Sequence, residues 1–301
     1  MHKLGTVDVL YPSHCLLGES PLWHAGRGSC FWIDIKGHQL FEYHLDDGRC
    51  TQYQVEPYSS FIGQCTDDQF IIASQKGIFH YALNNGKKQL IADLGRMKNN
   101  YRCNDGAIDS QGRLWIGTMD MAMVSKGCLY CVEGPQHKVT EKLAGLAISN
   151  GIAWSLDDKT MYHIDSLNKH VDVYDYAAAS AEITKSRTPI KIPEDKGLPD
   201  GMTIDREGNL WIAFYGGYGL GKFNPATGEL LDFIEVPCPN VTSCCFAGEE
   251  LDLLIITTAR DGMDSSAQRS YPLSGHTFVT KVAVPGVPEY KYVISYGKKT
   301  P

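Results

Sequence analysis

The chain has 301 residues, of which 43% are hydrophobic, and carries a formal net charge of −7 at neutral pH. This composition supports a large apolar core, and an acidic balance without basic clusters argues against nucleic acids and anionic membranes as partners. No apolar run approaches the roughly 18 residues of a membrane helix, and the first ten residues resemble a strand rather than a signal peptide.

Strand-like runs separated by Gly, Asn, Asp and Pro turns follow one another along the whole chain. Only the Ala-rich segment from Tyr176 to Lys185 comes near a helical period, and it is expected to form at most a turn of helix in a loop. The sequence therefore predicts an all-β protein. The clearest strand patterns cover residues 39–45, 77–83, 127–133, 170–176 and 276–284.

A short phrase recurs in step along these strands. A polar Asn or Asp near a Gly is followed about 11 to 12 residues later by an aromatic strand residue, as in Asn104 to Trp115 and Asp200 to Trp211. Six strand residues occupy the second position of this phrase, about 39 to 49 residues apart, which is the range of four-stranded propeller blades. These anchors are Trp32, Ile71, Trp115, Tyr162, Trp211 and Ile255.

The six repeats predict one domain over residues 1–301, folded as a six-bladed β-propeller with four strands per blade. Too few strands follow Ile255 to complete the last blade. We therefore expect Val7–Leu10 to join that blade as its outer strand, which closes the ring and protects a sheet edge.

In a propeller, the first strand of each blade lines the central channel. The polar residues that lead these strands should then converge near one mouth of the channel: Glu19, Asn104, Asn150 and Asp200. Their oxygens suit Ca²⁺, Mg²⁺ or Mn²⁺, whereas zinc would be in an unusually oxygen-rich site. The alternative interpretation is that Asn-Gly and Asp-Gly are ordinary turn signals. Four copies in register with the anchors favour the channel interpretation.

The ten cysteines lie mostly within strand patterns, where cysteine behaves as a small buried hydrophobe. Without a secretory signal they favour a reduced, cytoplasmic protein. The pair Cys128 and Cys131 has the spacing of a zinc or redox motif, which alternation on a strand explains as well. His163 and Asp165 are interpreted as packed or solvent-facing rather than catalytic. Serine-hydrolase chemistry is not indicated because the chain has no Gly-x-Ser-x-Gly elbow.

Taken together, the motifs resemble those of the regucalcin (senescence marker protein)/gluconolactonase family, and in particular its insect-type members and the related luciferin-regenerating enzyme of fireflies. The resemblance covers essentially the whole chain. It rests on residues 17–21, 102–106, 112–119, 149–154, 161–166, 199–202 and 208–211.

The resemblance implies a six-bladed propeller that holds one divalent cation (Ca²⁺, Zn²⁺, Mn²⁺ or Mg²⁺) in its channel. Glu19, Asn150 and Asp200 match the metal ligands of the family, and Arg102 and Asn104 match its substrate contacts. Asp200 also matches the general base. The implied activity is opening of sugar lactones, with the metal as Lewis acid. Small-molecule lactones are the implied partners, and composition suggests a monomer or weak dimer.

The sequence departs from the family pattern after Met119. Vertebrate members carry a Glu pair there that helps to bind the sugar, whereas this chain has Asp120, Met121, Ala122 and Met123. Asp120 is the candidate substrate contact in place of that pair, and the methionines suggest a more apolar lid. Phe214, Tyr215 and Tyr218 are candidates for an aromatic wall over the pocket, with core or loop packing as the alternative.

Two other functions are retained beside the lactonase. One is a cytosolic calcium-binding regulatory protein, and the other is a metal-dependent hydrolase of a different small molecule. Arg102, Asn104 and Asp200 favour an enzyme, because a calcium buffer has no need of an Arg beside its metal.

Overall fold

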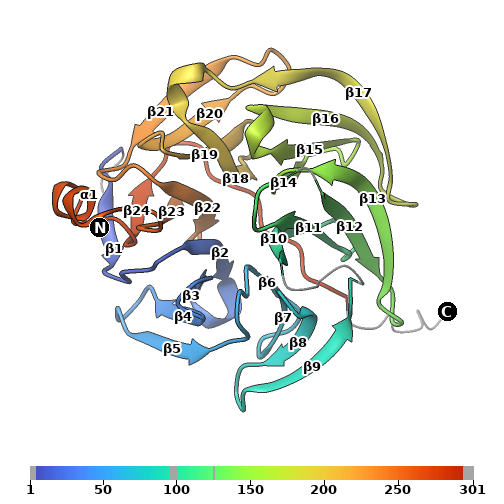
Figure 1. Cartoon of the computed structure of the whole chain (residues 1–301), viewed down its shortest axis with the longest axis horizontal. Helices are drawn as coiled ribbons and strands as arrows, with labels where there is room; N and C mark the ends of the chain where they lie inside the picture. The colour runs from blue at the N-terminus through green and yellow to red at the C-terminus, as the bar shows by residue number, and fades with distance from the viewer. Residues whose placement is uncertain (1–4, 95–99, 125, 294–301) are drawn as a thin grey trace.

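The computed structural model describes residues 5–94, 100–124 and 126–293. Six antiparallel four-stranded sheets surround a central axis as the blades of a propeller, each with one strand innermost (Figure 1). Blades 1 to 3 consist of β2 (Gly18–His24), β3 (Ser29–Asp34), β4 (Gln39–His44) and β5 (Cys50–Gln54); β6 (Phe61–Gln64), β7 (Gln69–Ser74), β8 (Gly77–Ala82) and β9 (Lys87–Ala92); and β10 (Tyr101–Ile108), β11 (Leu114–Asp120), β12 (Gly127–Glu133) and β13 (Lys138–Leu146). Blades 4 to 6 consist of β14 (Ser149–Trp154), β15 (Thr160–Asp165), β16 (His170–Ala177) and β17 (Glu182–Lys191); β18 (Leu198–Ile204), β19 (Leu210–Tyr215), β20 (Gly219–Phe223) and β21 (Leu230–Glu235); and β22 (Val241–Ala247), β23 (Leu253–Thr258), β24 (Thr277–Lys281) and β1 (Asp8–Tyr11).

The N-terminal strand closes the ring as predicted. β1 pairs antiparallel with β24, with Val9 opposite Phe278, and becomes the outer strand of blade 6. Each of the six anchor residues lies on the second strand of its blade and is buried. The predicted propeller with four strands per blade is therefore confirmed.

In blades 3 and 5, a buried Asp in the turn after the inner strand explains why the anchor is a tryptophan. In blade 3, Asp109 accepts hydrogen bonds from the Arg113 amide (3.0 Å), from Arg113 Nε (2.7 Å) and from Trp115 Nε1 (2.8 Å). One buried carboxylate thus closes the turn and also satisfies the indole of the next strand, which would otherwise bury an unpaired donor.

The Asn-Gly and Asp-Gly pairs lie inside the inner strands and form no turns there. Asn150 and Gly151 are within β14, and Asp200 and Gly201 are within β18. A Cβ on Gly151 would lie 2.8 Å from the carbonyl oxygen of Asp200 and 2.6 Å from Met202 Cβ. Glycine is therefore required by the close approach of neighbouring inner strands, which settles the alternative in favour of the channel interpretation.

Most inner strands carry a β-bulge at the same phase. The pairing register shifts between Glu19 and Leu22, between Cys103 and Gly106, between Asn150 and Ile152, between Pro199 and Met202, and between Val241 and Ser243. A bulge re-aims the side chains around it and terminates regular pairing. Four of these five bulges coincide with the polar positions that the repeat places on the axis.

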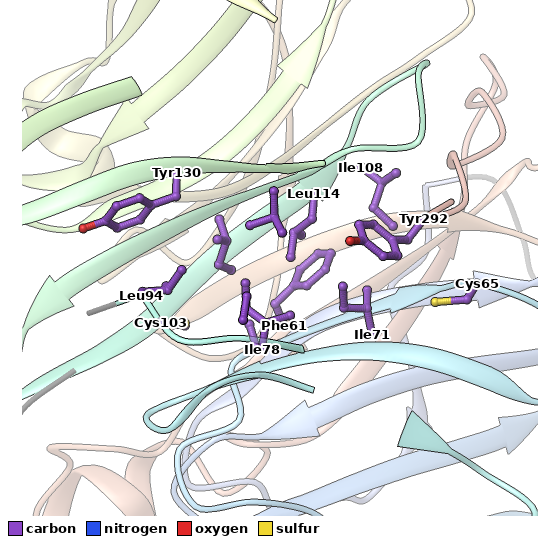
Figure 2. Close-up of a cluster of buried hydrophobic side chains, with 14 of the residues drawn as sticks. Phe61, Cys65, Ile71, Ile78, Leu94, Cys103, Ile108, Leu114, Tyr130 and Tyr292 are labelled. Carbon is purple, nitrogen blue, oxygen red and sulfur yellow. The ribbon is translucent and has the colours of Figure 1, made fainter. Parts of the chain in front are cut away.

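Apolar clusters fill the spaces between neighbouring blades. Figure 2 shows the cluster between blades 2 and 3, in which Phe61 and Ile71 of one blade pack with Ile108 and Leu114 of the next. Tyr292, from the C-terminal segment, joins the same cluster. The ring is therefore stabilised mainly by burial between blades, as in other repeat architectures.

The C-terminal segment crosses one end of the channel. It leaves blade 6, pairs with the turn of blade 5 through Asp205 and Gly286, and donates from the amide of Tyr292 to Gln64 of blade 2 (2.8 Å). Figure 1 shows this red trace passing across the centre of the ring. The two mouths of the channel are therefore not equivalent.

Two local predictions differ from the structure. The segment from Tyr176 to Lys185 contains a turn in which the Ala181 amide donates to Ala177, but its second half belongs to β17 and not to a loop. The described residues contain one α-helix, α1 (Ser265–Ser270), which was not predicted; Asp264 caps it by accepting from the amides of Ser266 and Ala267. Short 3-10 turns lie at Ala25–Arg27, Ser166–Asn168 and Glu194–Lys196.

No helix among the described residues has the length and apolarity needed to cross a membrane. Nine of the ten cysteines are buried, which agrees with their interpretation as small core residues. The predicted single domain over 1–301 includes residues 1–4, 95–99, 125 and 294–301, which lie outside the described part of the chain.

Candidate metal and substrate site

A pocket of about 490 Å³ opens at one mouth of the channel. The inner strands of four blades bring the polar residues predicted from the repeat to its wall. These residues are Glu19 of β2, Asn104 of β10, Asn150 of β14 and Asp200 of β18, with Arg102 of β10 beside them. The structure thus brings together five of the six predicted site residues.

A chain of hydrogen bonds orients the amides of the site across three blades. Arg102 Nη1 donates to Asn104 Oδ1 (2.7 Å), and Asn104 Nδ2 donates to Asn150 Oδ1 (2.8 Å). Asn150 Nδ2 donates in turn to Ser166 Oγ (2.8 Å), which donates to the carbonyl oxygen of Pro199 (2.7 Å). Both amide atoms of Asn104 are thus used for positioning. Asn150 Oδ1 accepts one of these bonds and retains a second lone pair for a ligand.

The carboxylates of Glu19 and Asp200 line the same pocket, and the positive charge of Arg102 does not compensate fully for theirs. Burial raises the pKa of each well above its ordinary value; repulsion from Asp200 and Asp105 adds to the effect at Glu19, and repulsion from Asp105 adds to it at Asp200. Arg102 opposes these shifts without cancelling them, while burial lowers the pKa of its own guanidinium. The site is therefore electrostatically suited to a cation.

The donor set fits a hard divalent cation. Two carboxylates and one amide oxygen belong to the oxygen ligands that Ca²⁺, Mg²⁺ and Mn²⁺ prefer, and waters or substrate would complete their shells. Within the described residues, no hydrogen bond or ion pair to the Asp200 carboxylate is found, so its oxygens are available. The same residues contain no group of three or more His, Cys, Asp or Glu with metal-binding geometry. A metal here depends on Asn150 as the third protein ligand.

The sixth predicted site residue is placed differently. The Asp120 carboxylate accepts from the Ala122 amide (2.8 Å) and so holds the turn at the end of β11. The pocket wall is formed instead by its neighbours Met119, Met121 and Met123. Asp120 as a substrate contact stays a prediction without support from this geometry.

Several residues of the pocket rim were not predicted. Lys36 Nζ, from the β3–β4 turn, forms an ion pair with Asp261 of blade 6 at 2.6 Å, and Tyr215 donates to the Asp261 carbonyl at 3.1 Å. Of the proposed aromatic wall only Tyr215 lines the pocket, because Phe214 is fully buried and Tyr218 contacts Tyr271 on the surface. Contacts between loops of different blades leave no local pattern in the sequence.

His163 and Asp165 have structural roles, in agreement with the prediction. The Asp165 carboxylate accepts from the amides of Ala147 (3.0 Å) and Ile148 (2.9 Å), and His163 Nε2 lies 2.8 Å from Ser149 Oγ. Burial lowers the pKa of His163 to about 4. Both residues therefore support the start of β14, the strand that carries Asn150.

A second cavity of about 250 Å³ lies at the mouth that the C-terminal segment covers. Burial raises the pKa of Asp105, on the channel wall, to about 6, and that of Glu289, on the segment, to about 8. Glu289 borders this cavity, and the pocket that contains Glu19 and Asp200 opens at the other mouth. Access to the predicted ligands is therefore from one side of the ring.

Comparison with known proteins identifies a family over most of the chain. Residues 17–260 match the family described as the SMP-30/Gluconolactonase/LRE-like region. Regucalcin of Oryctolagus cuniculus is 33% identical over 95% of this chain and 98% of its own length. A solved structure of regucalcin from Agrobacterium tumefaciens, described as a calcium-binding protein, is 30% identical with a TM-score of 0.91, covering 95% of this chain and 97% of that chain. A luciferin-regenerating enzyme is 31% identical with a TM-score of 0.89, covering 96% of this chain and 99% of that chain.

Proposed function

Because the chain belongs to the SMP-30/gluconolactonase/LRE-like family, we propose that it is a divalent-metal-dependent hydrolase that opens lactones, with sugar lactones as the reference substrates. The observation that carries this proposal is the pocket itself. Two carboxylates and an amide oxygen stand beside the half-buried Arg102 guanidinium in a hollow large enough for a small cyclic ester.

Glu19, Asn150 and Asp200 would hold the cation, which when bound would supply Lewis-acid activation of the ester carbonyl. Asp200 accepts a proton from the attacking water while the water oxygen bonds to the carbonyl carbon. The ring C–O bond then breaks, the proton returns to the leaving alkoxide, and a hydroxy acid is released. Arg102, held by Asn104, has donors left for the substrate carbonyl or the new carboxylate.

Calcium binding without turnover is the second candidate. It is favoured by the similarity to the regucalcin described as a calcium-binding protein and by the same oxygen donors. It gives no role to the donors of Arg102 that Cys103 and Asn104 leave unused. For either function, we also propose a cytoplasmic location and a monomeric or weakly dimeric state.

Metal removal and replacement separate the two candidates. We expect protein freed of metal by a chelator to lose acid release from glucono-δ-lactone, and Ca²⁺, Mg²⁺, Mn²⁺ or Zn²⁺ to restore it to different extents. The measurement is the rate above spontaneous hydrolysis, with metal binding followed by calorimetry in parallel. Metal binding without hydrolysis of any lactone would refute the lactonase and leave the calcium-binding function.

A further inference from the structure

The pocket is layered, with a polar floor beneath an apolar wall. Leu17, Ile148 and Leu198 line it, and each stands two positions before one of the ligands Glu19, Asn150 and Asp200. The equivalent position before Asn104 is Arg102. Because the repeat sets the same height in each blade, these residues form a collar that is apolar in three blades and cationic in the fourth.

Methionines extend the apolar wall outward from blade 3. Met119, Met121 and Met123 all line the pocket; Met119 is buried, whereas Met121 is 37% and Met123 53% exposed. The turn that presents them is held by the Met121 amide donating to Asn100 and the Met123 amide donating to Asp120, both at 2.7 Å. Thioether side chains are polarizable and adapt to irregular apolar groups.

Lys36, Asp261 and Tyr215 on the described rim are engaged with one another, and Tyr58 also lines the pocket. Lys36 pairs with Asp261, and Tyr215 donates to the Asp261 carbonyl. A sugar bound here would place several hydroxyls along the apolar wall, and a hydroxyl left unpaired against methionine weakens binding. An apolar substituent would instead cover the exposed methionine surface.

We infer that the pocket selects lactones that carry an apolar substituent, an alkyl chain or an aryl ring, which lies along Met119, Met121 and Met123 while the ester reaches the polar floor. This inference rests on the proposed lactone hydrolysis and names its substrate class. Met121 and Met123 determine specificity for the substituent and touch no reacting atom.

The test compares three δ-lactones with metal-loaded full-length protein: glucono-δ-lactone, unsubstituted δ-valerolactone and the pentyl-substituted δ-decalactone. Burial of a methylene is worth roughly two- to fourfold, so partial burial of the tail should raise kcat/KM for δ-decalactone at least about tenfold above the other two. The double variant Met121→Gln/Met123→Gln keeps side-chain length and adds polarity. It should lower the ratio of kcat/KM for δ-decalactone to that for δ-valerolactone by about tenfold.

The matched control is Leu90→Gln/Leu231→Gln, which changes two apolar side chains of comparable exposure on outer strands and should leave the ratio unchanged. Faster hydrolysis of glucono-δ-lactone than of δ-decalactone would overturn the inference while the lactonase stands. If no lactone is hydrolysed, the lactonase fails. Calorimetry then decides the inference by itself, through about tenfold tighter binding of 5-hydroxydecanoate than of 5-hydroxypentanoate and its loss in the methionine variant. Equal binding of the two acids would refute it.

Discussion

Asp200 and Asp205 lie five residues apart on blade 5 and are both buried, yet their surroundings are opposite. Asp205 accepts from the amides of Glu207 (3.0 Å) and Asn209 (2.9 Å), from Trp211 Nε1 (3.1 Å), and pairs with Lys222 at 2.9 Å. Asp200 has no such partner within the described chain and faces other carboxylates.

The difference identifies which end of the inner strand serves the fold and which serves the site. A carboxylate with all its partners stabilises the turn that starts the next strand, whereas one without partners is a cost that only a ligand offsets. Blade 5 thus keeps its satisfied carboxylate at the turn and its available one at the channel.

The substitution with the largest expected effect on this comparison is Asp200→Asn. The amide keeps the shape but cannot take a proton, so we expect kcat for the best lactone to fall by about 10²- to 10⁴-fold. Stability of the metal-free protein should not fall, because a charge without partners is removed. Activity assays, calorimetry with the metal and thermal unfolding measure the three effects. Retained metal with full activity would exclude Asp200 as the base.

The converse test substitutes the carboxylate that has all its partners. Asp205→Ala leaves Lys222 and the Trp211 indole buried without their partner. We expect a loss of about 3–5 kcal/mol in the free energy of unfolding, with unchanged kcat in the protein that remains folded. Urea unfolding measures the first and an assay at low temperature the second. Asp157→Asn, in the equivalent turn of blade 4 with a 60% exposed side chain, is the control and should change neither. An unaltered midpoint for Asp205→Ala would contradict the structural role.

A smaller expected effect is the loss of stability at acidic pH that comes from buried His163. The pKa of buried His163 is about 4 in the folded protein, below its ordinary value of 6.5, so the unfolded chain binds the proton first. The stability that neutral His163 maintains is complete above pH 6.5 and is lost as the pH falls from 6.5 to 4, by about 3 kcal/mol in total.

The variant His163→Gln should remove this part of the acid sensitivity, although it changes stability at neutral pH as well. The measurement is the slope of the unfolding free energy between pH 6.5 and 4. Identical slopes for the parent and His163→Gln would show that His163 does not contribute.

The features that could be predicted from the sequence are those that repeat along the chain. The phrase that ends in Trp115 and Trp211 recurs because blades 3 and 5 use the same local contact, an Asp in the turn that accepts from the indole of the next strand. Those contacts are short-range and repeat, so blade number, strand order and the phase of Glu19, Asn104, Asn150 and Asp200 could be read from the chain. Ring closure by the N-terminal strand followed from counting strands.

Contacts that occur only once in the molecule could not be predicted from the repeat. Ser166 as the partner of Asn150, the ion pair of Lys36 with Asp261, and the path of residues 285–293 across the second mouth each join segments far apart in the chain. Asp120 shows the same limit, because its turn directs the carboxylate to a backbone amide and leaves the wall to the methionines. The sequence by itself determined the ring and the height of the ligands, since both depend on a local period. Only the tertiary structure decided which mouth is open and what surrounds the ligands, since those contacts form only when the ring has closed.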